Sequence, residues 1–291
     1  MSKRGWSLFA SLCVIWGIPY LFIKVAVADV PPPVLVFLRT GIAVLVLLPF
    51  AVREPGLRRL LPKWPWILGY TAAELAVPWL MLARAEQHIP SGLAGLLVAT
   101  VPLLGIVVYR FTGAHEPIDA RRLAGLFIGF AGVAALVGID IGSLNGGALA
   151  EMSLVVLGYT LGPLFISRGL AGLSSLWVVV VSLGLTALVY SPAAAVEFPS
   201  HISGEAWAAI AVLAVVCTAV AFLLFFALIR EVGPARSVVI TYVNPAVAIL
   251  CGVIVLGEPL TAGMAIGFPL VLIGCVLGTS AKAETAAEPV P

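Results

Sequence analysis

The chain has 291 residues, of which 62% are hydrophobic and only 10% are charged, with a formal net charge of +2. Soluble domains carry roughly a quarter of charged residues, so this composition excludes an ordinary water-soluble domain and is typical of a membrane protein. The near-neutral charge argues against nucleic-acid binding, which needs a basic face, and the four cysteines are too far apart to indicate a metal site or a disulfide framework.

Ten apolar runs are long enough to cross a bilayer as helices, for which about 20 residues suffice. In chain order they are 6–27, 33–52, 65–85, 90–110, 119–138, 147–168, 174–194, 205–229, 234–256 and 262–280. The first run follows two basic residues, as in a signal peptide, but it is too long for one. The sequence therefore predicts an all-α integral membrane protein with ten transmembrane helices.

The basic residues predict how these helices are oriented. With ten spans, every Lys and Arg except Lys24, Arg39 and Arg84 falls on the side of the N-terminus. Basic residues concentrate in cytoplasmic loops, so we expect both termini in the cytoplasm. The protein is then a multi-pass protein of the cell inner (cytoplasmic) membrane.

The two halves of the chain repeat the same landmarks. Glu116-Pro117 recurs as Glu258-Pro259, and other landmarks recur at closely similar spacing, namely Gly125 as Gly267, Gly132 as Gly274, and Pro102 as Pro245. A duplicated apolar half is the usual build of a secondary transporter.

Each half holds five helices, and because five is odd, the second copy enters the membrane from the opposite face. We therefore expect a first five-helix repeat at 1–140, a second, inverted five-helix repeat at 141–281, and a disordered cytoplasmic tail at 282–291. In such folds the substrate site lies near the bilayer midplane, and alternating access moves one bundle against the other.

Several motifs stand in a characteristic order. They are Trp16-Gly17 in the first helix, Arg39 in the second, a proline in the fourth helix of each half, and a Glu-Pro link with spaced glycines at each fifth helix. Because these motifs occur in this order, the chain resembles the EamA-type transporters of the drug/metabolite transporter superfamily over about residues 5–280. The resemblance implies a ten-helix carrier that moves small organic metabolites, often amino acids or their relatives, usually outward and without a cofactor. One departure is that many relatives carry an aromatic residue before the fourth-helix proline, and only the second half has one here, Tyr242.

Aromatic residues follow one stripe of the first helix. Trp16, Tyr20 and Lys24 are spaced i, i+4 and i+8. Tyr159 is the repeat equivalent of Trp16, so an aromatic pair facing across the two-fold axis would form a pocket for an apolar or amphipathic metabolite. The alternatives are that these rings pack helices together or lie in the interfacial aromatic belt. Lys24 is expected to extend to the headgroups.

Glu74 is the residue that costs most to place in the membrane. It lies roughly 14 Å from the inner end of the third helix at 1.5 Å per residue, where an ionised side chain costs about 2.5–3.5 kcal/mol. We expect Glu74 either to couple transport to protons or to form a structural ion pair. Arg39, at a similar depth, is the natural partner, and its alternative role is in the substrate cavity.

Four prolines are expected to interrupt helical hydrogen bonding, because proline leaves the carbonyl four residues earlier without its donor. These candidate helix breaks or gating positions are Pro78, Pro102, Pro163 and Pro245. The alternative is that the kinks only shape the bundle. Tyr242 and Asn244 are the best uncharged candidates for substrate binding, ahead of Thr100 and Thr218, because a lone threonine often bonds its own backbone.

Glu116 and Glu258 are expected to be structural. Each lies in a link shortly before a helix, where Asp119 or Thr261 is a good N-cap and the helix dipole stabilises a carboxylate. The small-xxx-small pairs Gly125/Gly129 and Gly263/Gly267 are packing motifs, which either pack the fifth and tenth helices together or join two protomers.

The leading hypothesis is a secondary active transporter that works by alternating access. Its candidate substrate-binding or coupling residues are Trp16, Tyr20, Arg39, Glu74, Tyr159, Tyr242 and Asn244. A passive channel or a membrane scaffold protein is the alternative, and an intramembrane enzyme is less favoured because no nucleophile–base set or metal-ligand motif lies at membrane depth. The expected partners are a small-molecule substrate and membrane lipid, with no metal, cofactor or nucleic acid, while substrate identity, direction, proton coupling and oligomeric state stay open.

Overall fold

The computed structural model describes residues 2–111, 120–139, 145–233, 237 and 240–279. Within these residues every regular element is helical and no strand is present. The expected boundary between the halves and the expected C-terminal tail both lie outside the described residues.

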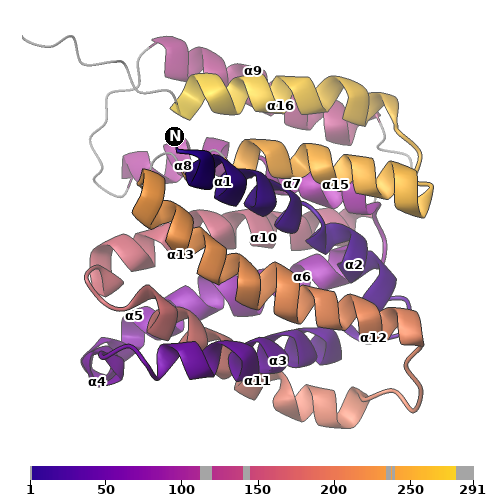
Figure 1. The fold of residues 1–291 in the computed structure, drawn as a ribbon. Coiled ribbons are helices and arrows are strands. Elements are labelled where there is room, and N and C mark those ends of the chain that lie inside the picture. Colours follow the sequence, from indigo (N-terminus) through magenta and orange to yellow (C-terminus); the bar gives the residue numbers. More distant parts are fainter. Residues whose placement is uncertain (1, 112–119, 140–144, 234–236, 238–239, 280–291) are drawn as a thin grey trace, which may run out of the picture.

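The helices of the two halves follow one another with short links (Figure 1). The first half contains α1 (Lys3–Ile15), α2 (Pro19–Ala26), α3 (Pro32–Ala51), α4 (Leu57–Leu60), η1 (Leu61–Lys63), α5 (Trp64–Tyr70), η2 (Thr71–Ala76), α6 (Val77–Ala85), α7 (Ser91–Val98), α8 (Val101–Phe111) and α9 (Ala120–Ile139). The second half contains α10 (Gly146–Phe165), η3 (Ile166–Leu170), α11 (Ser175–Glu197), α12 (Gly204–Ala211), η4 (Val212–Val220), α13 (Ala221–Val232), α15 (Ile240–Leu256) and α16 (Ala262–Thr279).

Seven helical stretches of the described residues are long and apolar enough to cross a membrane. They are Lys3–Ala26, Pro32–Ala51, Leu57–Ala85, Ser91–Val108, Gly146–Leu170, Ser175–Glu197 and Gly204–Val232. Shorter apolar helices at Leu123–Leu136, Ile240–Leu256 and Ala262–Leu277 fall where further spans are expected. The all-helical membrane fold is therefore confirmed, whereas the count of ten spans and the inverted relation of the halves stay predictions.

Proline determines where two of these stretches are interrupted. α1 ends at Ile15 and α7 ends at Val98, and in each case a proline, Pro19 or Pro102, lies four residues later. Proline has no N–H to donate to that carbonyl, so the helix stops and restarts as α2 or α8. Pro163 and Pro245, by contrast, lie inside the continuous helices α10 and α15.

Three segments, η2, η3 and η4, are wider π-helical turns. In such a turn each N–H bonds the carbonyl five residues earlier, as the Val77 N–H does with Ala72, and π turns are frequent at functional sites. Pro78 lies two residues after the end of η2, so the carbonyl of Glu74 that it cannot bond lies within the wider turn. η2 holds Glu74, and η4 holds Thr218.

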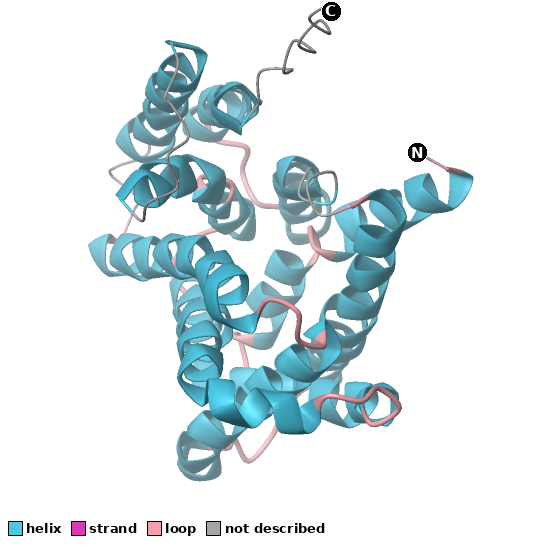
Figure 2. Ribbon diagram, turned by 90° about the vertical axis from the view of Figure 1, so that its left-hand side faces the viewer, coloured by secondary structure: helices cyan, strands magenta, loops and turns pink. Residues whose placement is uncertain are grey.

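The helices pack in pairs that each combine one helix from either half of the chain (Figures 1 and 2). The pairs are α3 with α11, α7 with α15, α9 with α16, α6 with α10, α1 with α13, and α2 with α12. In addition, η4 packs on α3 and η2 packs on α11. The largest hydrophobic core cluster draws side chains from both halves, so the two halves share one core.

Glycines bring α9 and α16 into close contact at one edge of the bundle (Figure 1). A Cβ added to Gly274 would lie 2.4 Å from the Cα of Gly129, and one added to Gly132 would lie 2.7 Å from the backbone nitrogen of Val271. These glycine stripes therefore pack two helices within the chain. That contact resolves the alternative that the sequence leaves open, since the same glycines cannot also face a second protomer.

Candidate functional site

Arg39 on α3 lies in the interior with only 7% of its surface exposed. Its Nε donates to the Oγ1 of Thr218 at 3.0 Å, and its Cζ lies 3.7 Å from the ring centroid of Trp79 on α6. The aromatic face attracts the guanidinium through its quadrupole. Within the described residues the guanidinium makes no ion pair, because the one pair within 4.0 Å joins Arg84 and Glu151.

Two tyrosines complete what we call the central cluster, which consists of Tyr20, Arg39, Trp79, Tyr159 and Thr218. Tyr20 on α2 is buried, and Tyr159 on α10 packs against the same hydrophobic core cluster as Trp79. Both hydroxyls lie within electrostatic range of Arg39. The cluster therefore combines one unpaired cation with three aromatic rings, contributed by both halves of the chain.

The π turn η4 explains why Thr218 is available to Arg39. The Oγ1 of Thr218 donates to the carbonyl of Leu213, five residues earlier, at 2.8 Å. A hydroxyl has one hydrogen to donate and two lone pairs with which to accept, so Thr218 satisfies its own backbone and still accepts from Arg39. Thr100, in contrast, bonds only the carbonyl of Leu97 at 2.6 Å, as the sequence suggests for both threonines.

Glu74 lies apart from Arg39, so the expected ion pair between them is not formed. Its Oε2 faces α10, where a Cβ added to Gly162 would overlap it. This oxygen is buried and has no hydrogen-bond partner among the described residues. Both residues lie at a similar depth along their helices, but depth along two helices does not define which faces of those helices meet.

Trp16 lies at the break between α1 and α2 and contacts α13. Its ring centroid lies 4.8 Å from that of Phe225 and 6.2 Å from that of Phe222. These are the ring contacts that the described residues give it, so Trp16 packs on helix α13 rather than facing Tyr159 directly. The break in the helix also separates Trp16 from the stripe that Tyr20 and Lys24 share on α2.

Lys24 does not extend to the headgroups. Its Nζ donates to the backbone carbonyls of Glu86 and Ile89, at 2.5 and 3.0 Å, in the turn between α6 and α7. A cation is favourable beside the unpaired carbonyls at a helix C-terminus. Lys24 therefore joins α2 to the end of α6.

Asn244 on α15 is a bridge between helices. In the amide orientation that satisfies its neighbours, its side-chain nitrogen donates to the carbonyls of Cys13 at 3.1 Å and Ile240 at 3.0 Å. The Cys13 carbonyl lies just before the break in the first span, where the N–H of Gly17 bonds Val14 instead. Asn244 thus provides a donor for a carbonyl that the broken helix does not use.

Tyr242, two residues before Asn244 on α15, is half-buried and packs against the largest core cluster. Its neighbour Pro245 is buried within α15. The structure therefore places Tyr242 and Asn244 on the helix that packs on α7, but Asn244 is directed toward α1.

Glu258 is structural, as expected, but its contacts are with α7 rather than with the helix that follows it in sequence. Its carboxylate accepts from the backbone N–H groups of Ser91 (2.7 Å) and Gly92 (3.1 Å) and from the Ser91 hydroxyl (3.0 Å). It therefore caps the N-terminus of α7. Thr261 caps α16 by accepting from the N–H of Met264 at 3.1 Å, whereas Glu116 and Asp119 lie outside the described residues.

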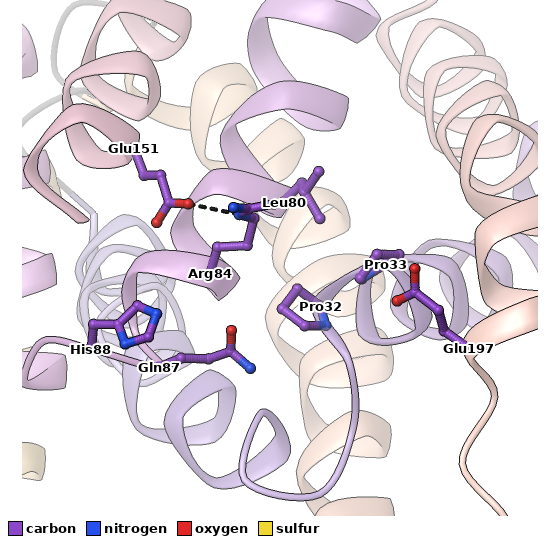
Figure 3. A pocket seen from close by; sticks show the side chains of 8 residues that line it. All are labelled: Pro32, Pro33, Leu80, Arg84, Gln87, His88, Glu151 and Glu197. Carbon is purple, nitrogen blue, oxygen red and sulfur yellow. Dashed lines mark hydrogen bonds and ion pairs between the residues drawn. The ribbon is translucent and has the colours of Figure 1, made fainter. Parts of the chain in front are cut away.

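A cavity of about 340 Å³ opens above the central cluster, and we call it the vestibule (Figure 3). Its lining comes from the N-terminal ends of α3 and α10 and the C-terminal ends of α6 and α11, namely Pro32, Pro33, Leu80, Arg84, Gln87, His88, Glu151 and Glu197. Figure 3 shows Arg84 and Glu151 facing one another, with the Arg84 Nε 2.6 Å from the Glu151 Oε1. Tyr159 lies two turns further along α10 than Glu151, so roughly 12 Å deeper.

Sequence reasoning missed Trp79, Glu86 and the vestibule, and it placed too little weight on Thr218. Trp79 follows Pro78 and lies three residues after the end of the π turn, and this combination is the signal that would have drawn attention to it. Glu86 follows the last apolar residue of its helix, so a hydropathy window assigns it to a polar link, yet it is completely buried.

Comparison with known proteins places the chain in a family. The model of the EamA-like transporter family matches residues 3–138 and 148–279. The chain is 30% identical over 295 residues to the uncharacterized inner membrane transporter YedA of Escherichia coli (strain K12), covering 98% of this chain and 93% of that protein. It is 28% identical over 292 residues to the uncharacterized transporter YvbV of Bacillus subtilis (strain 168), covering 96% and 93%.

Two further likenesses are more limited. The probable amino-acid metabolite efflux pump of Escherichia coli (strain K12) is 28% identical over 159 residues, which cover 54% of this chain and 49% of that protein. A solved crystal structure has the same fold, with a TM-score of 0.66 at 19% identity over 96% of this chain and 97% of that one. Since the family model matches most of the chain and the apolar helices are those of a multi-pass membrane protein, this protein belongs to the EamA-like transporter family.

Proposed function

We propose that the protein is a secondary active transporter that exports small organic metabolites, amino acids or related compounds, across the cytoplasmic membrane by alternating access. The observation that carries this proposal is the unpaired Arg39 guanidinium in the interior of the bundle. A charged side chain at membrane depth is costly and usually serves a substrate or ion pathway. The proposal therefore takes the central cluster as the substrate site.

The geometry of Arg39 suits an anionic group. Its Nε is used by Thr218 and one face of the guanidinium covers Trp79, while no further hydrogen bond from it occurs within the described residues. The two Nη groups are the fork that binds a carboxylate in a bidentate manner. The aromatic rings beside it would contact the apolar part of the same metabolite.

The pairing of helices supports alternating access. Each packed pair takes one helix from either half, and the contacts of η4 with α3 are matched by those of η2 with α11. Such matching is expected of two halves related by a two-fold axis, with the site between them. The likeness of half the chain to a probable amino-acid metabolite efflux pump supports the substrate class.

The other residues that the sequence suggests for the site have different places in this proposal. Tyr20 and Tyr159 belong to the central cluster, whereas Trp16 and Asn244 hold helices together at the break in the first span. Tyr242 stays a candidate for substrate contact, and Glu74 a candidate for coupling. Pro78, Pro102, Pro163 and Pro245 stay candidates for gating.

The test is transport in proteoliposomes loaded with an unlabelled mixture of L-amino acids and related metabolites. Uptake of each labelled compound is measured for the natural protein, Arg39→Gln and the matched control Arg84→Gln, whose arginine is 55% exposed. We expect counterflow of one class of compound with the natural protein and with Arg84→Gln, and its loss in Arg39→Gln. Unchanged counterflow in Arg39→Gln would remove the central cluster as the site, and simple equilibration without counterflow would favour a channel.

A further inference from the structure

Glu86 carries a buried carboxyl group that is not part of the proposed substrate site. It directly follows the last residue of α6, and its exposed fraction is 0%. Its backbone N–H still bonds the carbonyl of Leu82 at 2.9 Å, so the residue closes the last turn of the helix. A carboxylate at a helix C-terminus faces the negative end of the helix dipole, which is an unfavourable place for a negative charge.

The carboxyl group also lacks the contacts that an ionised form needs. Neither Oε1 nor Oε2 has a hydrogen-bond partner among the described residues, although the backbone of Lys24 lies near it. A buried charge is tolerated only when it is paired and hydrogen-bonded. The geometry of the closed bundle therefore suits a neutral, protonated carboxyl group.

Charged and titratable groups surround Glu86 from several elements. They are Lys24 and Tyr20 on α2, Arg39 on α3, Tyr159 on α10, and Glu258 in the link after α15. Burial raises the pKa of Glu86 well above its usual range, the Lys24 ammonium opposes that rise, and the Glu258 carboxylate adds to it. Glu258 is held in place by the α7 N-terminus, so its position is fixed.

The ammonium group of Lys24 lies near Glu86 and can pair with its ionised carboxylate. Its ammonium group has three N–H donors, of which two bond the carbonyls of Glu86 and Ile89. When water enters at this end of the bundle, the carboxylate can be hydrated and can turn toward Lys24. Glu86 is then protonated when these helix ends are closed, and it is ionised when they are open.

We propose that Glu86 is the proton-binding residue of the carrier, which holds one proton while the α6–α7 turn is closed and releases it to water when the turn opens. The inference rests on the proposed carrier function and names the group that couples it to protons. Only the O–H bond of the carboxylic acid breaks, and the proton goes to water.

Glu74 is the competing carboxyl group, and its setting differs. Only its Oε2 is buried without a partner, and the side chain as a whole is partly exposed. Its carboxyl group faces Gly162 of α10 from within the π turn η2. Among the described residues no charged group acts on Glu74 as Lys24 acts on Glu86.

Infrared spectroscopy of the protein in lipid nanodiscs tests the protonation directly. The C=O stretch of a buried carboxylic acid is followed as the pH is raised from acidic to alkaline, in the natural protein, Glu86→Gln and Glu74→Gln. We expect absorption that persists at neutral pH and disappears in alkali, with one component that Glu86→Gln removes and Glu74→Gln retains. Absorption that is unchanged in Glu86→Gln overturns the inference.

Transport separates this inference from the proposed function. Glutamine has the shape of a protonated glutamate, so Glu86→Gln is expected to fold and to keep counterflow of radiolabelled L-amino acids, while losing accumulation driven by a pH gradient. Gradient-driven accumulation that survives in Glu86→Gln overturns the inference, and so does loss of counterflow, which would make Glu86 a substrate ligand. If the natural protein itself shows no counterflow, the proposed function fails, and the infrared result still decides whether Glu86 carries the proton.

Discussion

At the scale of single residues, Arg39 shows how a bundle can hold a cation without neutralising it. In a buried ion pair a carboxylate of the protein would neutralise the guanidinium. A substrate would then have to break that pair in order to bind, which costs free energy. Here an aromatic face and a neutral hydroxyl hold the guanidinium in place. Its orientation is fixed while its charge stays available to a ligand.

Arg39→Lys is expected to impair transport although it keeps the charge. An ammonium group has neither the planar face that covers Trp79 nor the fork that bonds Thr218 and a carboxylate together. Loss of a hydrogen bond to a charged group costs about 1.5–3 kcal/mol, so the apparent affinity should fall roughly ten- to a hundredfold. Counterflow at varied substrate concentration measures this, with Arg84→Lys as the control, and equal affinity in Arg39→Lys would contradict it.

Asn244→Leu is expected to destabilise the protein rather than to alter substrate preference. The leucine is of similar size but leaves the Cys13 carbonyl without the donor that Asn244 provides. An unsatisfied buried carbonyl costs about 1–3 kcal/mol, which thermal unfolding in detergent would detect. Val243→Ala changes an exposed neighbour on the same helix and should unfold like the natural protein. Equal stability of both variants would argue against the bridge.

At the scale of elements, proline and glycine decide what each helix does. Pro19 and Pro102 end the preceding helices at the residues whose carbonyls they cannot bond, whereas Pro163 and Pro245 are accommodated within helices. Proline at a given depth therefore predicts a missing hydrogen bond, but the neighbouring helices determine whether the chain breaks. The sequence could therefore name Pro102, Pro163 and Pro245 as candidate helix breaks but could not tell which of them interrupts its helix, and Pro19 was not among its candidates.

Gly274→Ala is expected to separate α9 from α16. Its Cβ would lie 2.4 Å from the Gly129 Cα, which is backbone and cannot rotate away. Overpacking of this kind costs about 1–3 kcal/mol, to be measured as a lower thermal unfolding midpoint. Gly41→Ala is the matched control, because nothing lies within 4 Å of its added Cβ and alanine favours a helix by about 1 kcal/mol. A stable Gly274→Ala variant would contradict the packing.

At the scale of the whole molecule, contacts between the two halves close both ends of the bundle. At the vestibule end Arg84 on α6 pairs with Glu151 on α10. At the other end the Ser174 hydroxyl donates to the Glu54 carboxylate at 2.6 Å, and the Trp177 indole N–H donates to the Glu54 carbonyl at 2.9 Å. A carrier that alternates must break these contacts at one end at a time.

Joining the vestibule end covalently is expected to stop transport. Arg84→Cys and Glu151→Cys, combined and joined by a short reducible thiol cross-linker, would hold α6 against α10. Both partners of the ion pair are removed together and the Arg84 side chain is 55% exposed, so no uncompensated buried charge is left and the variant should transport before cross-linking and again after reduction. Counterflow measures each stage, with the Arg84→Cys and Glu151→Cys single substitutions as controls. Full transport in the cross-linked state would place the moving parts elsewhere.

Part of the candidate site was predictable because membrane depth can be counted along a helix. Arg39 was named as a candidate in this way, whereas Tyr20 was named from its helical spacing to Trp16 and Tyr159 as the repeat equivalent of Trp16. Glu86 was not found, because a residue at the end of a helix looks exposed until the elements that cover it are known. Whether Arg39 pairs with Glu74 was left open by the sequence for a related reason, because counting depth leaves the facing side of each helix undefined.

By itself the sequence determined that the chain is helical and lies in a membrane, since nothing else accommodates so apolar a composition, and the repeated landmarks indicated two similar halves. Only the tertiary structure decided that Thr218 and Trp79 hold Arg39, that Lys24 and Glu86 meet at the end of α6, and that the glycine stripes pack within one chain. The physical reason is the same in each case. Hydrophobicity is a property of each residue and can be summed along the chain, whereas a contact depends on the rotation and separation of two helices, which the packing of all of them sets together.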